Sequence, residues 1–169
     1  MRYVLAANLD ALQQGVHLLQ RLKAEAYGVR NPLVSNTSIG LHIRHISDHY
    51  VCLERGLADG RVDYTRRAPD PEVENQRDAG LAALQRAVGF VTRLSAARSR
   101  LLLVRMDTSP ADDRIWSLSS VTRELEFVLS HTVHHHALVS VLCRLLSVPV
   151  DDGFGVAHST LVRQSAKQM

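Results

Sequence analysis

The sequence predicts an all-α protein whose four long helices form a four-helix bundle, with a long connection between the third and the fourth helix. Apolar residues recur at spacings of three and four in four separate segments, as expected for helices that each turn one face to a core. Aromatic residues make up only 5% of the chain, and Ala, Leu and Val dominate its apolar residues, which favours helix packing over a β-sandwich. A chain of 169 residues fits one domain, so we expect residues 1–169 to form a single unit.

The first two helices are predicted over residues 3–27 and from about residue 38 to 59. Gly28 and Pro32 end the first helix. Thr37 or Ser38 can cap the second at its amino end, and Gly60 can end it. The stripe of the first helix is formed by Val4, Leu5, Leu9, Leu12, Val16 and Leu19, and that of the second by Ile39, Ile43, Ile46, Leu53 and Leu57.

The third helix is predicted over residues 71–97, after a charged loop at residues 61–71. Asp70 can cap this helix, with Pro71 at its first position. Residues 100–107 have strand character without an obvious partner strand, so we interpret them as an extended connection across the bundle, and residues 110–114 as a turn.

The fourth helix is expected to begin at Ser117, Ser119 or Ser120 and to end near Ser147, before Pro149. Its amphipathic run, residues 118–146, contains no internal Gly or Pro. Beyond it we expect a tail with a final helical turn at residues 159–163.

Charge and composition exclude several classes of partner. The formal charge is +3, from 20 basic and 17 acidic side chains spread along the chain, and no basic run is interleaved with aromatic residues, so we expect no nucleic-acid partner. No apolar stretch reaches the roughly 18 residues that a membrane span needs, and no signal-peptide pattern begins the chain. Cys52 and Cys143 are expected to be reduced, partly buried thiols, so we expect a cytoplasmic protein that does not bind membranes.

The histidines of residues 130–136 carry the strongest chemical signal. His131 and His135 are four residues apart on a predicted helix, so their side chains face the same way, with His134 beside them. His136 points elsewhere. Such a pair can bind a transition metal through two imidazole nitrogens, and a third ligand must then come from another segment.

His42, His45 and His49 on the second predicted helix could provide that ligand. Their spacing of three and four places them on one side of the helix. A count of 100° per residue puts His42 and His49 nearer the apolar stripe than His45, so spacing alone leaves the third ligand open. Three neutral imidazoles with a free coordination position suit zinc or nickel, and iron is also accepted.

Two carboxylates lie near these histidines in the sequence. Asp48 could orient a ligand histidine or act as a catalytic base, and the alternative is a solvated helix residue. Glu124 lies seven residues before His131, and therefore on the same helix face. We expect its carboxylate to form a surface salt bridge, with a fourth ligand or a base as the alternatives.

Three segments carry a family resemblance. Residues 38–46 (Ser-Ile-Gly-Leu-His-Ile-Arg-His-Ile) resemble the second-helix signature of the DinB-like metal-binding bundles. Residues 129–135 are similar to that family's later His-x-x-x-His signature, and residues 154–161 to the Gly-x-Ala-x-Ser-Thr-Leu ending of some members. The segments occur in the family's order and cover most of the chain. The resemblance implies His45, His131 and His135 as the metal ligands.

The chain departs from that pattern at two places. Ser130 stands where many members have an acidic residue, and His136-Ala137-Leu138 stands where many have Gly-Gln after the second histidine. Both departures leave the three histidines intact and leave the substrate open.

The resemblance implies a metal-dependent enzyme in which the ion activates a thiol or water. Members include low-molecular-weight thiol S-transferases, a thiol-dependent isomerase and hydrolases, so the substrate would be a small molecule such as a low-molecular-weight thiol. A homodimer is also implied, and the apolar side chains of residues 101–104 need cover beyond one thin bundle. The alternatives are a non-catalytic metal-binding stress-response bundle and a helical interaction protein without metal.

Overall fold

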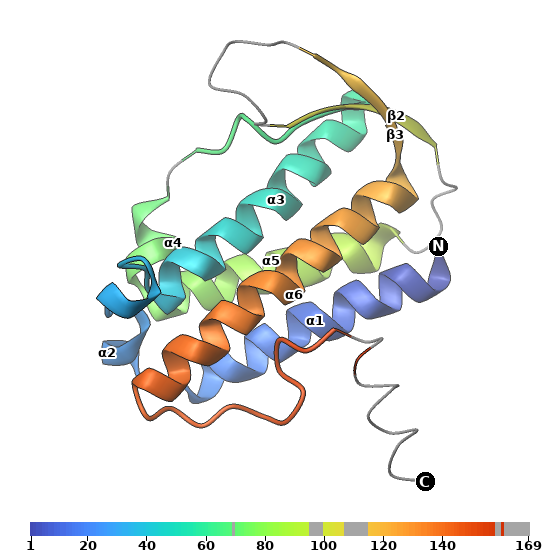
Figure 1. Cartoon of the computed structure of the whole chain (residues 1–169). Coiled ribbons are helices and arrows are strands. Elements are labelled where there is room, and N and C mark those ends of the chain that lie inside the picture. Colours follow the sequence, from blue (N-terminus) through green and yellow to red (C-terminus); the bar gives the residue numbers. More distant parts are fainter. Residues whose placement is uncertain (69, 95–99, 107–114, 158–159, 161–169) are drawn as a thin grey trace, which may run out of the picture.

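The computed structural model describes residues 1–68, 70–94, 100–106, 115–157 and 160. In this part of the chain the protein is mostly helical, with one small three-stranded sheet (Figure 1). The helices and strands, in chain order, are α1 Arg2–Arg21, α2 Ala24–Tyr27, the 3₁₀ turn η1 Pro32–Val34, α3 Ile39–Asp59, β1 Arg61–Asp63, α4 Pro71–Asn75, α5 Arg77–Arg93, β2 Leu101–Arg105, β3 Ser117–Ser120 and α6 Val121–Leu145. Helices therefore dominate the described residues, as predicted.

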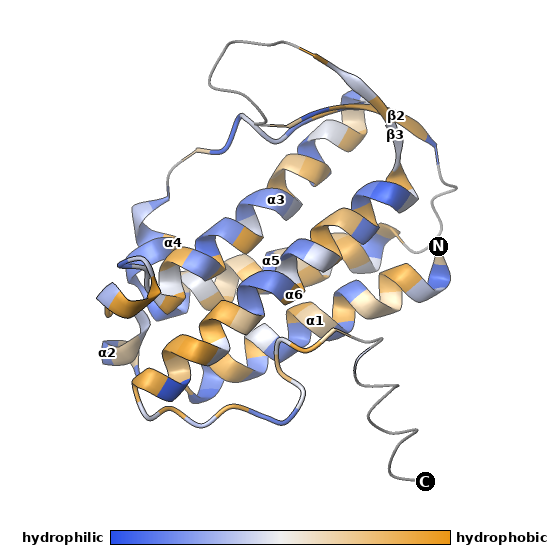
Figure 2. Ribbon diagram, viewed as in Figure 1, coloured by the Kyte–Doolittle hydropathy of each residue, from blue (hydrophilic) through white to orange (hydrophobic). Residues whose placement is uncertain are grey.

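The four long helices α1, α3, α5 and α6 enclose one apolar core. Helix α1 packs against α5 and α6, and α3 packs against the same two helices, so each long helix has two long neighbours. Apolar and polar residues alternate around each of these helices (Figure 2). The apolar faces meet inside, where the side chains with no exposed surface include Leu12, Leu19, Ile43, Leu53, Leu84 and Leu125. Among the described residues, no helix is both long and apolar enough to cross a membrane.

The first helix is shorter than predicted. The prediction continued it to residue 27. Helix α1 ends at Arg21, and Leu22 is extended, with φ −71° and ψ 134°. This conformation buries the Leu22 side chain, and its carbonyl accepts a hydrogen bond of 2.8 Å from Arg77. Tertiary contacts therefore decide the break, and the short helix α2 then brings Tyr27 into the core.

The second predicted helix is found as α3, with both ends where local signals placed them. The Ser38 hydroxyl accepts a hydrogen bond of 3.1 Å from the Leu41 amide at the amino end. At the other end Gly60 has φ +71°, a left-handed conformation that glycine adopts without strain. Helix α3 carries His42, His45 and His49 on one continuous element.

The third predicted helix is divided into α4 and α5. Asp70 caps α4 as expected, accepting a hydrogen bond of 3.1 Å from the Val73 amide, but Gln76 is extended and interrupts the helix. Tyr27 packs at this break: its hydroxyl donates to the Val73 carbonyl at 2.7 Å, and a Cβ on Gly80 would lie only 1.9 Å from the hydroxyl oxygen. The missing side chain at Gly80 makes room for this buried ring. Helix α5 is described to Arg93, and the predicted end at residue 97 lies outside the described residues.

The predicted unpaired connection is wrong, because residues 101–105 form the central strand of the sheet. Strand β2 pairs in parallel with β1, with Val62 opposite Val104, and antiparallel with β3, with Leu103 opposite Leu118. The partners were not recognised because β1 is a three-residue strand inside a charged loop, and β3 occupies the predicted start of the fourth helix. The turn predicted at residues 110–114 lies outside the described residues.

Helix α6 begins after the third of the predicted serines. The Ser120 hydroxyl accepts a hydrogen bond of 3.2 Å from the Arg123 amide, and the helix ends at Leu145, close to the predicted residue 147. The chain then returns along α6, where a Cβ on Gly155 would lie 2.5 Å from the Ala137 amide nitrogen. Apart from residue 160, the predicted final turn lies outside the described residues.

Candidate metal centre

Three histidines from two helices come together where α3 packs against α6. Each of His45, His131 and His135 offers one ligand atom, and these atoms lie within 4.8 Å of one another. The ring centroids are 4.9 Å apart for His45 and His131, 4.6 Å for His45 and His135, and 4.5 Å for His131 and His135. All three side chains are half-buried, and such a group could hold a metal ion.

One nitrogen of this group has no partner within the described structure. The Nε2 atom of His131 is buried without a hydrogen bond. An unpaired buried polar atom destabilises a protein by about 1–3 kcal/mol. A metal ion bound between the three rings would supply the missing partner, so the residues present fit a metal.

The three imidazoles are neutral at pH 7. Burial, and then repulsion from neighbouring imidazoles, lowers the pKa of His45 to about 4, that of His131 to about 3 and that of His135 to about 2. A metal binds the deprotonated nitrogen of an imidazole. The local environment therefore keeps lone pairs available well below neutral pH.

His42 lies beside this group, but both of its ring nitrogens are engaged. Nδ1 is 2.9 Å from Nδ1 of His135, and Nε2 is 3.1 Å from the hydroxyl oxygen of Thr37. The sequence suggested Thr37 only as a helix cap. Its position five residues before His42 gave no signal of this contact.

His49 is buried and also makes its own hydrogen bonds. Its Nδ1–H donates to the His45 carbonyl at 2.8 Å, and its Nε2 lies 3.5 Å from a guanidinium nitrogen of Arg67. The His49 and His131 rings are close, with centroids 4.0 Å apart, but His49 is not part of the three-histidine group. The count of 100° per residue favoured His42 and His49, and these two are the more buried residues. The structure instead places a ligand atom of His45 with those of His131 and His135.

The two remaining histidines of α6 are not part of this group, although His134 lies beside it as predicted, with its ring centroid 5.2 Å from that of His135. His134 is exposed. His136 is buried, and its ring stacks on Phe154 with centroids 4.6 Å apart. Helix α1 also lies against that ring, since a Cβ on Gly15 would lie 3.1 Å from its Nε2.

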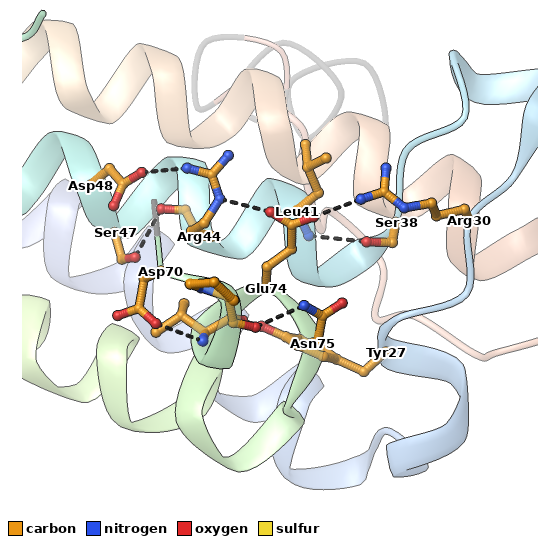
Figure 3. Close-up of polar contacts among 12 residues, drawn as sticks. Tyr27, Arg30, Ser38, Leu41, Arg44, Ser47, Asp48, Asp70, Glu74 and Asn75 are labelled. Atoms are coloured by element: carbon orange, nitrogen blue, oxygen red, sulfur yellow. Dashed lines mark hydrogen bonds and ion pairs between the residues drawn. The ribbon is translucent and has the colours of Figure 1, made fainter. Parts of the chain in front are cut away.

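Asp48 is engaged by an arginine on its own helix. Its carboxylate accepts a hydrogen bond of 2.8 Å from Arg44, which also bonds Glu74 at 3.1 Å, and Glu74 pairs with Arg30 at 2.7 Å (Figure 3). Burial raises the pKa of Asp48, against the opposing effect of Arg44. The contacts described for its carboxylate do not include a histidine, so its role as a base stays a prediction.

Asp48 also lines a cavity of about 260 Å³ beside α3. Cys52, Arg55, Arg67 and Arg86 contribute to the same wall. The three grouped histidines are not among the lining residues, so this cavity opens beside the candidate centre rather than onto it. Arg67 connects the two regions, because it also lies against His49.

Glu124 is neither a surface residue nor part of the histidine group. It is buried, and its carboxylate accepts hydrogen bonds from the Tyr64 hydroxyl at 2.9 Å and from the Ser119 hydroxyl at 2.5 Å. The predicted surface salt bridge is therefore wrong. Glu124 instead ties the sheet region to the first turn of α6.

A mostly helical fold with a three-histidine group defines this protein as one with a candidate metal centre. No protein-family model matches the chain, and no solved structure matches it. The chain is similar over part of its length to FK506-binding protein 5 of Rhizopus delemar, with 28% identity over 103 residues. These residues are 59% of this chain and 26% of that relative, so the match spans about a quarter of the fungal protein.

Proposed function

We propose that this chain is a metal-dependent enzyme of the DinB-like kind, in which the four long helices form a bundle. His45, His131 and His135 would hold one divalent transition ion, with zinc and nickel best suited and iron also accepted. The observation that carries this proposal is the group itself: three neutral, half-buried imidazoles whose ligand atoms lie within 4.8 Å.

The number of ligands favours a catalytic centre over a purely structural one. Structural zinc sites are closed by four protein ligands, whereas catalytic sites keep three and leave one position open. No fourth His, Cys, Asp or Glu joins this group in the described part of the chain. A bound ion would activate a thiol or a water molecule as the nucleophile at that position.

The chain's own residues would arrange and tune this centre. Helix α6 presents His131 and His135 one turn apart, and α3 presents His45 opposite them. The ring nitrogens of His49 and His42 are engaged in hydrogen bonds, which supports His45 as the third ligand. Asp48 is proposed as the base, with Oδ1 as the accepting atom, since Arg44 bonds Oδ2.

The resemblance suggests a small-molecule substrate such as a low-molecular-weight thiol, and no nucleic-acid or membrane partner. We also propose a cytoplasmic location. Cys52 and Cys143 are both buried free thiols, which suits a reducing compartment.

The second candidate is a non-catalytic metal-binding stress-response bundle, in which the ion only fixes α3 to α6. The position of the described cavity favours this alternative, because its wall does not include the three histidines. The third candidate, a helical interaction protein, would bind no metal.

Cobalt(II) separates these functions, because its visible absorption reports its ligands. Elemental analysis of protein purified without a His-tag first tests for one ion per chain, and absence of metal favours the interaction protein. The cobalt-loaded chain is then titrated with a small thiol. A new thiolate-to-cobalt absorption band is expected for an open position, whereas an unchanged spectrum favours the non-catalytic bundle.

A further inference from the structure

Hydrogen bonds connect His135 through His42 to a backbone carbonyl. The Nδ1 atoms of His135 and His42 are 2.9 Å apart, and Nε2 of His42 lies 3.1 Å from the Thr37 hydroxyl oxygen. The Thr37 hydroxyl in turn donates to the Val34 carbonyl at 2.7 Å. This series of hydrogen bonds crosses from α6 through α3 to the turn that precedes α3.

The Val34 carbonyl fixes the direction of every hydrogen bond in this series. A carbonyl oxygen only accepts, so the single hydroxyl proton of Thr37 points to Val34. The Thr37 oxygen must then accept from His42 Nε2–H. A neutral imidazole has one N–H, so Nδ1 of His42 is bare and accepts from Nδ1–H of His135. It follows that Nε2 of His135 carries the free lone pair.

We propose that His42 is a positioning residue that, anchored by Thr37, holds His135 in the Nδ1–H form and directs its Nε2 to the metal. This inference rests on the proposed metal centre. The second ring nitrogen of a metal-binding histidine usually donates a hydrogen bond, which fixes the tautomer and the ring orientation. Here the acceptor is the neutral imidazole of His42. The ring of His135 is therefore oriented without an added negative charge.

The directions of these hydrogen bonds also exclude two other roles for His42, that of a metal ligand and that of a proton relay. His42 has no free lone pair, so it is not itself a ligand. The series of hydrogen bonds ends on the Val34 carbonyl, which does not take up a proton. This series therefore does not carry protons away from the metal. Positioning of His135 is the role that the bonds leave.

Two substitutions of similar shape test the accepting atom. In His42→Asn the amide oxygen can replace the imidazole Nδ1 as acceptor, whereas His42→Leu has no acceptor. Thr37→Val removes the anchor without changing the shape of the side chain. Each variant is checked for folding by circular dichroism and titrated with Zn²⁺ by calorimetry. Nitrogen NMR of the metal-free proteins reports the tautomer of His135.

We expect His42→Leu to weaken Zn²⁺ binding by about 10- to 100-fold, the range typical of such partners. His42→Asn should recover most of this loss, and Thr37→Val should weaken binding by a smaller factor. His135 should be in the Nδ1–H form in the parent protein and lose that preference in His42→Leu.

Equal Zn²⁺ affinity in all variants would overturn the proposal. It would also be overturned if Leu and Asn were equally harmful while the tautomer of His135 stayed unchanged, because His42 would then act only in packing. A parent protein that binds no Zn²⁺ would instead refute the metal centre, and the tautomer measurement would still test the hydrogen-bond chain by itself.

Discussion

His45 and His131 face each other across the contact between α3 and α6, with ring centroids 4.9 Å apart. The Nε2 atom of His131 is buried there without a hydrogen-bond partner in the described residues. Removing either ring, or that of His135, would leave only two imidazoles. We therefore expect His45→Ala, His131→Ala and His135→Ala each to abolish stoichiometric metal binding, measured by elemental analysis of untagged protein.

His49→Ala provides the matched control on the same helix, because this ring uses both nitrogens in hydrogen bonds. We expect it to retain one ion per chain. If His49→Ala lost the metal while His45→Ala kept it, the assignment of His45 would be wrong. Full metal content in all three ligand variants would refute the site.

Removing the metal should lower the melting temperature. An ion that binds only the folded chain stabilises it by about 2.7 kcal/mol at a hundred times its Kd. For a chain of this size, each kcal/mol shifts the melting temperature by about 2–4 °C. Differential scanning calorimetry with and without a chelator should show a decrease of roughly 5–10 °C. His135→Ala should show no decrease, and an equal decrease in that variant would indicate an effect of the chelator elsewhere.

The metal-free protein should lose stability as the pH falls from about 6.5 to 4, and His136 should contribute to this loss. Burial lowers the pKa of His136 to about 4, against an ordinary value of 6.5. In that interval the unfolded chain binds a proton that the folded chain does not, which favours unfolding. His136→Leu removes this contribution and two buried nitrogens that have no hydrogen-bond partner among the described residues.

Urea unfolding of the metal-free proteins at pH 7.5 and 5 measures the effect. The stability of His136→Leu relative to the parent should rise as the pH falls, approaching about 1.4 kcal/mol per pH unit. Its metal content should equal that of the parent. A constant difference between the two proteins at both pH values would show that His136 is not the titrating group.

Two glycines on α5 should respond in opposite directions to alanine. A Cβ on Gly80 would lie 1.9 Å from the hydroxyl oxygen of the buried Tyr27, so Gly80→Ala should destabilise the protein by about 1–3 kcal/mol. A Cβ on Gly89 would meet only the flexible end of Arg93 at 3.4 Å. Gly89→Ala should therefore stabilise the helix by about 0.5–1 kcal/mol. Thermal unfolding of both variants tests the packing of Tyr27, and equal effects would contradict it.

The exposed face of the sheet is the predicted site of homodimerisation. Leu101 is 69% exposed and Leu118 is 70% exposed, and Leu103 pairs with Leu118 on the same face. An apolar surface of this kind needs a cover. We expect a dimeric mass in light scattering at micromolar concentration and a monomeric mass for Leu118→Glu. Tyr3→Glu, at another exposed apolar residue, is the control and should remain dimeric. A monomeric parent protein would contradict the prediction.

Short-range signals in the sequence predicted several helix boundaries. Ser38, Asp70 and Ser120 cap helices through bonds to amides three residues ahead, and Gly60 ends α3 in a left-handed conformation. Such bonds involve only neighbouring residues, so they can be read without knowledge of the fold. The pairing of His131 with His135 follows for the same reason, since one helical turn brings them together whatever packs against it.

Only the tertiary structure decided which residue of α3 lies against that pair. His42, His45 and His49 share one side of the helix, and the choice depends on the rotation of α3 against α6, on Thr37 beside His42 and on Arg67 beside His49. The helix breaks at Leu22 and Gln76 and the pairing of β2 have the same origin. Each is fixed by partners distant in sequence, and periodicity along one segment carries no information about the segment it will meet.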